Sequence, residues 1–237
     1  VNPEHRRLAE HAGPDDEPEQ ADAAPRIDRH MRGEAQAARE ILRPVFRQPQ
    51  QFRIVCREGK LDELLGQLAS HWLDIVLADE PAPSSLKFKT FSHPLGGCGV
   101  MVCARPKLAR KLRKNFPESL NGAPALLPTE NTPLRLAIER WFERVGVRPH
   151  AVAEFDDGAL MRVFASEVDC FFMIHAVAVD ETVTRNNFRV IGEATGCRTE
   201  FYAITRERQI RHAGVVAVTE NAQRQLFAPF ENTPRIA

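Results

Sequence analysis

The side chains best suited to bind a small polar molecule follow two apolar runs in the second half of the chain. The run APALLP is followed by Thr129, Asn131 and Thr132, and the run VDCFFMI by His175. Parallel strands end at a common edge of a sheet, where open α/β folds bind ligands, and a helix that starts there offers free N–H groups to an anion. We therefore predict that these four residues contact a small anion or polar ligand. Helix capping by the threonines and a structural role for the histidine are the alternatives.

Three acids gather in the segment EFDDGALMRVFA, at Glu154, Asp156 and Asp157. Carboxylate oxygens are ligands for hard cations, so these residues form a candidate cation site. A helix that begins at Gly158 also needs an N-cap, and Asp156 or Asp157 stands in that position. Helix capping is the favoured interpretation of the acids.

The cysteines give no metal-binding pattern. Cys98 and Cys103 are five residues apart on an extended segment, so their side chains point to opposite faces and cannot hold one ion. The chain has five cysteines without a C-x-x-C pair, mostly inside apolar runs, which is typical of buried thiols in a reducing compartment. The sequence also lacks the H-E-x-x-H, G-x-S-x-G, Walker A and G-x-G-x-x-G motifs. We expect no disulfide, metal, cofactor or catalytic activity.

The overall charge is balanced. Lys plus Arg and Asp plus Glu each number 32 in 237 residues, so no global field attracts nucleic acid or a membrane. DNA contact would need a local patch, and the segment 106–120 carries five close cations at Lys107, Arg110, Lys111, Arg113 and Lys114. A solvated helix face is the favoured interpretation of this cluster. Since neither a membrane span nor a signal pattern is present, we expect a cytoplasmic protein.

Apolar periodicity predicts alternating strands and helices. Helices are predicted at 34–46, 60–71, 106–120, 132–146, 158–166, 175–183 and 212–228. Strands are predicted at 51–59, 73–79, 86–93, 99–105, 123–128, 150–156, 168–174, 188–194 and 198–207. This alternation is typical of a doubly wound α/β protein, here with two Rossmann-like lobes. We assign 34–104 and 198–237 to lobe I and 105–197 to lobe II.

Local sequence signals add detail to two of the predicted helices and predict one disordered segment. In the helix at 132–146, Thr132 is the expected N-cap and Gly146 the expected stop. In the helix after the three acids, Leu160, Met161 and Phe164 are expected to face inward. Residues 1–33 have no aromatic residue, Lys, Ser or Thr, and we predict that they are disordered.

One segment resembles a known family. GKLDELLGQLASHWLDIVLADEP, residues 59–81, resembles the effector-binding domain of LysR-type transcriptional regulators, in which a Leu-rich helix leads to an LD strand. EFDDGALMRVFA and EFYAITRERQIRHAGVVAV look like the NhaR-type branch, the sodium-responsive activators of the sodium/proton antiporter. The resemblance covers about residues 36–228.

The resemblance implies two lobes like those of periplasmic binding proteins, a small effector between them, and homo-oligomers. It places effector contacts on Thr129, Asn131, Thr132 and His175. The effector is sodium, as the resemblance suggests, or an organic anion. A solute-binding protein of the same fold is the alternative, and a small enzyme a third possibility.

Two features depart from the family pattern. The winged helix-turn-helix that reads DNA should precede the effector domain, and residues 1–33 lack its apolar periodicity. We therefore expect DNA contact only through a winged helix-turn-helix domain that is not seen in this chain. PRIDRHMRG also stands where the family has an apolar first strand, so we expect that strand to be missing. The composition of this region suggests an out-of-frame or mis-started reading of a GC-rich gene.

Overall fold

The structure, a computed structural model, describes residues 26–30, 35–43, 46, 55–130, 132–208 and 213–223. Eight strands of these residues form one mixed sheet in the order β2-β1-β3-β8-β4-β7-β5-β6. The strands are β1 (Arg26–His30), β2 (Val55–Glu58), β3 (Ile75–Ala78), β4 (Phe91–Ala104), β5 (Pro124–Pro128), β6 (His150–Phe155), β7 (Phe171–His175) and β8 (Arg189–Thr205). The α-helices are α1 (Ala35–Leu42), α2 (Leu61–Ala69), α3 (Pro106–Leu112), α4 (Pro133–Val145), α5 (Gly158–Glu167), α6 (Val179–Asn186) and α7 (Ala213–Asn221). Short 3-10 helices in the described residues include η3 (Arg113–Asn115), η4 (Glu118–Leu120) and η5 (Ala176–Ala178).

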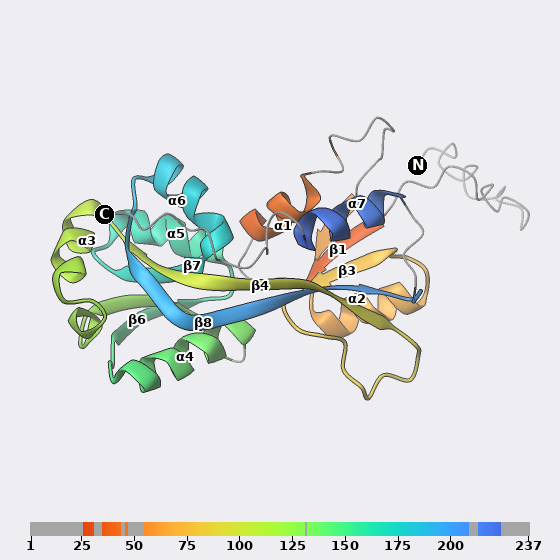
Figure 1. Cartoon of the computed structure of the whole chain (residues 1–237), viewed down its shortest axis with the longest axis horizontal. Coiled ribbons are helices and arrows are strands. Elements are labelled where there is room, and N and C mark those ends of the chain that lie inside the picture. The colour runs from red at the N-terminus through yellow and green to blue at the C-terminus, as the bar shows by residue number, and fades with distance from the viewer. Residues whose placement is uncertain are drawn as a thin grey trace, which may run out of the picture.

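The sheet is divided into two lobes, and β4 and β8 run through both (Figure 1). In lobe I, β2, β1 and β3 are parallel neighbours, and β3 pairs with the end of β8. In lobe II, β6, β5 and β7 are parallel neighbours, and β7 pairs with the end of β4. Helices cover both faces of each lobe, so the predicted two-lobe α/β fold is confirmed.

The apolar core is divided in the same way. Within the described residues, four clusters of buried side chains form, one on each face of the sheet in each lobe. In lobe I, α1 and α7 pack on one face and the four buried leucines of α2 on the other. In lobe II, α3 and α4 pack on one face and α5 on the other. Each lobe therefore has a core of its own, which leaves room for a site between the lobes.

Helix α4 forms where its sequence signals predict it. The Thr132 hydroxyl accepts a hydrogen bond from the backbone N–H of Arg135, which satisfies one free donor of the first turn. Pro133 occupies the first turn, where no N–H is needed. Gly146 ends the helix in the left-handed conformation with φ 72°, which glycine adopts without a Cβ clash. Both predicted caps are confirmed.

The first strand corrects the prediction for residues 1–33. Residues 26–30, which we predicted to be disordered, form β1, and the rest of that segment lies outside the described residues. This strand is central in lobe I, paired in parallel with β2 on one side and with β3 on the other. The family's first strand was therefore wrongly expected to be missing. Its sequence RIDRH lacks the apolar run that predicts a buried parallel strand.

Helix α5 and the long strands also differ from their predictions. On α5, Met161 is buried as expected, but Leu160 and Phe164 are about half exposed. The segments predicted as four separate strands join into two, β4 and β8. Glycines and a proline within them hide this continuity, because such residues interrupt the alternating pattern where a strand bulges.

We predict that one cysteine of five reacts rapidly with a thiol reagent near pH 8. Cys56 is exposed, whereas the other four are buried. Burial raises the pKa of Cys103 to about 12 and that of Cys197 to about 11, so both stay protonated and unreactive near pH 8. Counting fast-reacting thiols in the native chain and in denaturant tests this. A second fast thiol in the native chain would show that a core is more open than the structure indicates.

Candidate functional site

A cavity of about 380 Å³ lies between the two lobes. Lobe II lines it with Thr132 and Pro133, at the start of α4. Lobe I lines it with Lys60, Leu61, Asp62, Leu65, Asp79, Glu80, Pro83 and Leu86. A cavity of this size accepts a small ligand, and a molecule held here would contact both lobes.

The lobe I wall is formed by the start of α2 and the end of β3. Lys60 precedes α2 in an extended conformation, and its side chain makes no cap hydrogen bond. Asp79 and Glu80 follow β3 directly, at the carboxyl edge of the parallel β1–β3 pair. Asp79 is only 8% exposed, whereas Glu80 is exposed to solvent. This is the strand edge at which α/β folds bind ligands.

The lobe II wall is formed by Thr132, which is 4% exposed. Its hydroxyl accepts from the N–H of Arg135 at 3.1 Å and donates to the carbonyl of Thr129 at 3.2 Å. A hydroxyl has two acceptor lone pairs, so one remains for a ligand. Thr132 thus caps the helix and lines the cavity at the same time.

Arg135 fixes the position of α4 behind this wall. Its Nη1 donates to the carbonyl of Pro128 at 2.5 Å and to Oε1 of Glu154 at 2.8 Å, and its Nε to Oε1 of Glu139 at 2.7 Å. Burial works against the charged form of Arg135, but the hydrogen bonds and charges of Glu154 and Glu139 outweigh it and raise the pKa. Arg135 therefore stays charged and joins α4 to the ends of β5 and β6.

The three acids of the candidate cation site each have a different partner. Glu154 pairs with Arg135, Asp156 accepts from the Thr129 hydroxyl, and Asp157 accepts from the N–H of Ala159 at 2.6 Å. Capping of α5 by Asp157 is therefore confirmed. Within the part of the chain that the structure describes, no three His, Cys, Asp or Glu side chains gather as a metal site. The cation site on these acids stays a prediction without support from the geometry.

Two of the remaining predicted residues, His175 and Thr129, are not part of the cavity lining. His175 ends β7 and is 2% exposed, with its ring edge-on to that of Phe201 at 5.1 Å. Since Phe201 belongs to the lobe I core, this ring pair lies at the junction of the lobes. Thr129 contacts Asp156 and Thr132 at the end of β5, and Asn131 lies outside the described residues. Of the four predicted binding residues, Thr132 lines the cavity.

A family model of the LysR substrate binding domain matches residues 35–226. The chain belongs to the LysR substrate-binding domain family. This LysR domain is 28% identical over 190 residues to the transcriptional activator protein NhaR of Escherichia coli (strain K12), which is 80% of this chain and 62% of that protein. It spans the same 62% of the NhaR protein of Shigella flexneri. The family assignment favours a regulator domain over a solute-binding protein.

Solved structures show the same LysR fold. The regulatory domain of HypT from Salmonella typhimurium matches with a TM-score of 0.62 at 12% identity, over 84% of this chain and 95% of that chain. DarR of Vibrio fischeri, solved in complex with DNA, matches with a TM-score of 0.63 at 14% identity, over 85% of this chain and 68% of that chain. Among the helices described here, none has the length and apolar character of a membrane span.

The lobe I wall of this LysR domain was not predicted from the sequence. Lys60, Asp62, Asp79 and Glu80 were left out, although the signal used for lobe II was present. Asp79 and Glu80 follow the apolar strand IVLA just as Thr129 follows PALLP. Applying the strand-edge rule to both lobes would have found them.

We predict that Arg135→Met lowers the free energy of unfolding by about 2 kcal/mol, because it removes charge-assisted hydrogen bonds and leaves Glu154 without this partner. Arg140→Met is the matched control, since Arg140 lies on the same helix and is exposed. We expect the control to change stability by less than about 0.5 kcal/mol. Urea unfolding measures the stability of both variants. Equal effects would contradict the conclusion that Arg135 stabilises the fold by joining α4 to β5 and β6.

Proposed function

We propose that this LysR domain senses a small effector in the cavity between its lobes and controls a promoter through attached DNA-binding domains. The cavity carries the proposal, because residues of both lobes line it. An effector that contacts both lobes binds their closed arrangement better than an open one. Only this difference in affinity shifts the population of the two arrangements. A regulator of promoters works beside DNA, so we place it in the cytoplasm.

We propose further that the effector is sodium and the target a sodium/proton antiporter gene. The similarity to NhaR supports this, together with the likeness of two segments to the sodium-responsive branch. The cavity lining also supports it, because it contains three carboxylate residues, Asp62, Asp79 and Glu80, but only one residue with an ammonium group, Lys60. Such a lining favours a cation over an organic anion. These acids do not form a gathered ligand set in the part described, so we propose that sodium binding accompanies closure.

We also propose that the domain forms homo-oligomers, as the resemblance implies. Exposed apolar side chains gather on α5, which packs beside the edge strand β6 through the Phe155 and Phe164 rings, and we call this surface the α5–β6 face. They are Leu160, Val163, Phe164 and the C-cap residue Val168. An apolar group of this kind next to a free strand edge is typical of a protein contact, and a second copy of the chain is the occupant that we infer.

The effector proposal is tested by thermal unfolding of the chain in sodium, lithium and potassium chloride of equal ionic strength, and with a panel of small organic acids. We expect sodium to raise the unfolding midpoint above that in potassium. A ligand at a hundredfold excess over its Kd stabilises a protein by about 2.7 kcal/mol. Equal midpoints in all salts would rule out sodium, and a shift with an acid alone would make the effector an anion.

Substitutions in the cavity give the second arm of this test. We expect Glu80→Gln and Asp79→Asn to reduce the sodium-dependent shift, because each removes a carboxylate from the lining. Glu118→Gln is the control, since Glu118 is an exposed acid on η4 in lobe II and outside the cavity lining. An unchanged shift in both cavity variants would place the effector elsewhere.

For the oligomer, we predict that Val163→Glu shifts the chain toward monomers. Val163 is 57% exposed, so the change adds a charge to the α5–β6 face without entering the core. Leu136→Glu on α4 is the control, because Leu136 is also exposed but belongs to a different helix. Light scattering after gel filtration measures the mass. Equal masses for wild type and Val163→Glu would rule out this face as the contact.

A further inference from the structure

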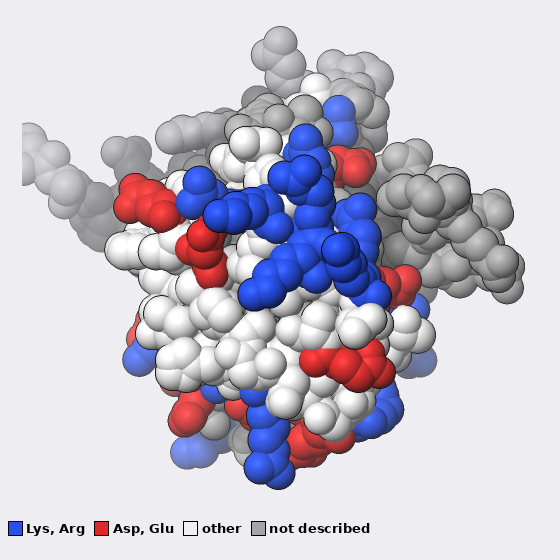
Figure 2. All heavy atoms as spheres, turned by 90° about the vertical axis from the view of Figure 1, so that its left-hand side faces the viewer, with Lys and Arg blue, Asp and Glu red and all other residues white. Residues whose placement is uncertain are grey.

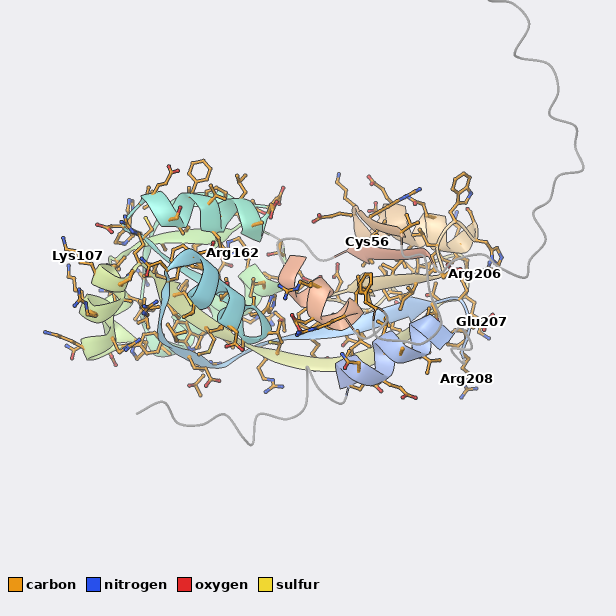
Figure 3. All side chains as sticks on the ribbon, turned by 90° about the horizontal axis from the view of Figure 1, so that it is seen from above. Cys56, Lys107, Arg162, Arg206, Glu207 and Arg208 are labelled. Carbon is orange, nitrogen blue, oxygen red and sulfur yellow. The ribbon has the colours of Figure 1, made fainter. Side chains whose placement is uncertain are left out.

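A concentrated basic surface covers the end of lobe II that lies farthest from lobe I (Figures 1 and 2). We call it the α3 basic surface. It consists of five exposed side chains on α3 and η3, namely Lys107, Arg110, Lys111, Arg113 and Lys114. Figure 3 shows Lys107 pointing away from the molecule at this end. Five cations in eight residues are a local feature, because the whole chain has a formal net charge of zero.

The helix period explains why these cations share one face. Residues three, four and seven positions apart lie on the same side of a helix, which is the spacing of Lys107, Arg110, Lys111 and Lys114. Ala109 and Leu112 occupy the opposite side and are buried in the lobe II core. At about 1.5 Å rise per residue, the row from Lys107 to Lys114 extends about 10 Å along the axis. The core contact therefore holds α3 with its charged side outward.

The five cations of this surface form no ion pair with the acids of the described residues. Arg113 donates a hydrogen bond to the carbonyl of Val190, which fixes its direction but leaves its charge. The neighbouring Arg105 does pair, with Asp169 at 3.7 Å. Within the part of the chain that the structure describes, the surface therefore presents a row of cations without ion-pair partners.

We propose that the α3 basic surface binds the phosphate backbone of duplex DNA. Phosphate contacts need Lys and Arg side chains and no sequence-specific pocket. An acidic protein partner fits less well, because protein interfaces have apolar or aromatic anchors at their centre. None of the large exposed apolar side chains found in the described residues lies on α3 or η3. The proposal rests on the proposed role as a regulator, which brings this domain close to promoter DNA.

Such binding would link the position of lobe II relative to lobe I to the bound DNA. The surface lies on lobe II alone, whereas the cavity is lined by both lobes. An effector that changes the angle between the lobes would therefore move the phosphate contact relative to lobe I. Binding to phosphates carries no sequence information, so it would add affinity and leave sequence choice to the DNA-binding domains.

The test measures binding of the full chain to a fluorescent duplex of arbitrary sequence, about 30 base pairs long, by anisotropy from about 50 to about 200 mM salt. A triple variant neutralises three cations of the surface: Lys107→Gln, Lys111→Gln and Lys114→Gln. The matched control neutralises three exposed cations of lobe I: Arg57→Gln, Lys87→Gln and Lys89→Gln. Thermal unfolding checks that both variants keep the wild-type midpoint.

We expect the surface variant to lose at least tenfold in affinity at low salt and the control to bind like wild type. Each lost phosphate contact should reduce the slope of log K against log salt by about 0.9, or roughly 3 in all. Equal losses in both variants, or no binding by wild type, would overturn the proposal. Binding to polyglutamate without binding to DNA would show an acidic protein partner instead. Because the titration salt is potassium chloride and sodium is left out, failure here leaves the sodium-dependent shift standing, and the reverse also holds.

Discussion

The antiparallel ladder between β4 and β8 is the constraint on which the rest of the structure depends. It runs from the pair Phe91 and Thr205 in lobe I to the pair Ala104 and Arg189 in lobe II. Buried backbone groups must keep their hydrogen bonds, so both strands continue across the junction. Register shifts near Gly99 interrupt the ladder between the two cores. A bulge of this kind lets strands bend and twist without ending, so this ladder is where the angle between the lobes can change.

This ladder also determines where a ligand can bind. Because β4 and β8 hold the lobes side by side, the start of α2 in lobe I and the start of α4 in lobe II border the same cavity. A second junction lies behind it, where His175 meets Phe201 and Val177 of η5 packs on the lobe I core. This packing limits how far the lobes can separate. A buried histidine at such a junction is best explained as a packing residue, which is the alternative that the sequence left open.

The parts of the fold and of the site that can be predicted from the sequence are those determined by a few neighbouring residues. Apolar stripes and caps such as Thr132 and Gly146 identify α4 from a few residues, and the strand-edge rule finds one wall of the cavity. The failures come from long-range packing. RIDRH becomes a central strand only because β2 and β3 pair with it on both sides. The sequence of these five residues does not predict this pairing. Leu160 and Phe164 follow a helical stripe, yet the stripe faces outward beside the edge strand β6.

Although the net charge of the chain is zero, its cationic, acidic and apolar side chains lie on separate surfaces. Lys107 and its neighbours place the cations at the far end of lobe II, while Asp62, Asp79 and Glu80 place carboxylates around the cavity. The apolar side chains of α5, such as Val163, form a third surface on another helix of lobe II. Because these surfaces do not share residues, phosphate, a cation and a second copy of the chain would not compete for the same groups. Coupling between the cavity and either of the two lobe II surfaces must therefore pass through the angle between the lobes, which the β4–β8 ladder controls.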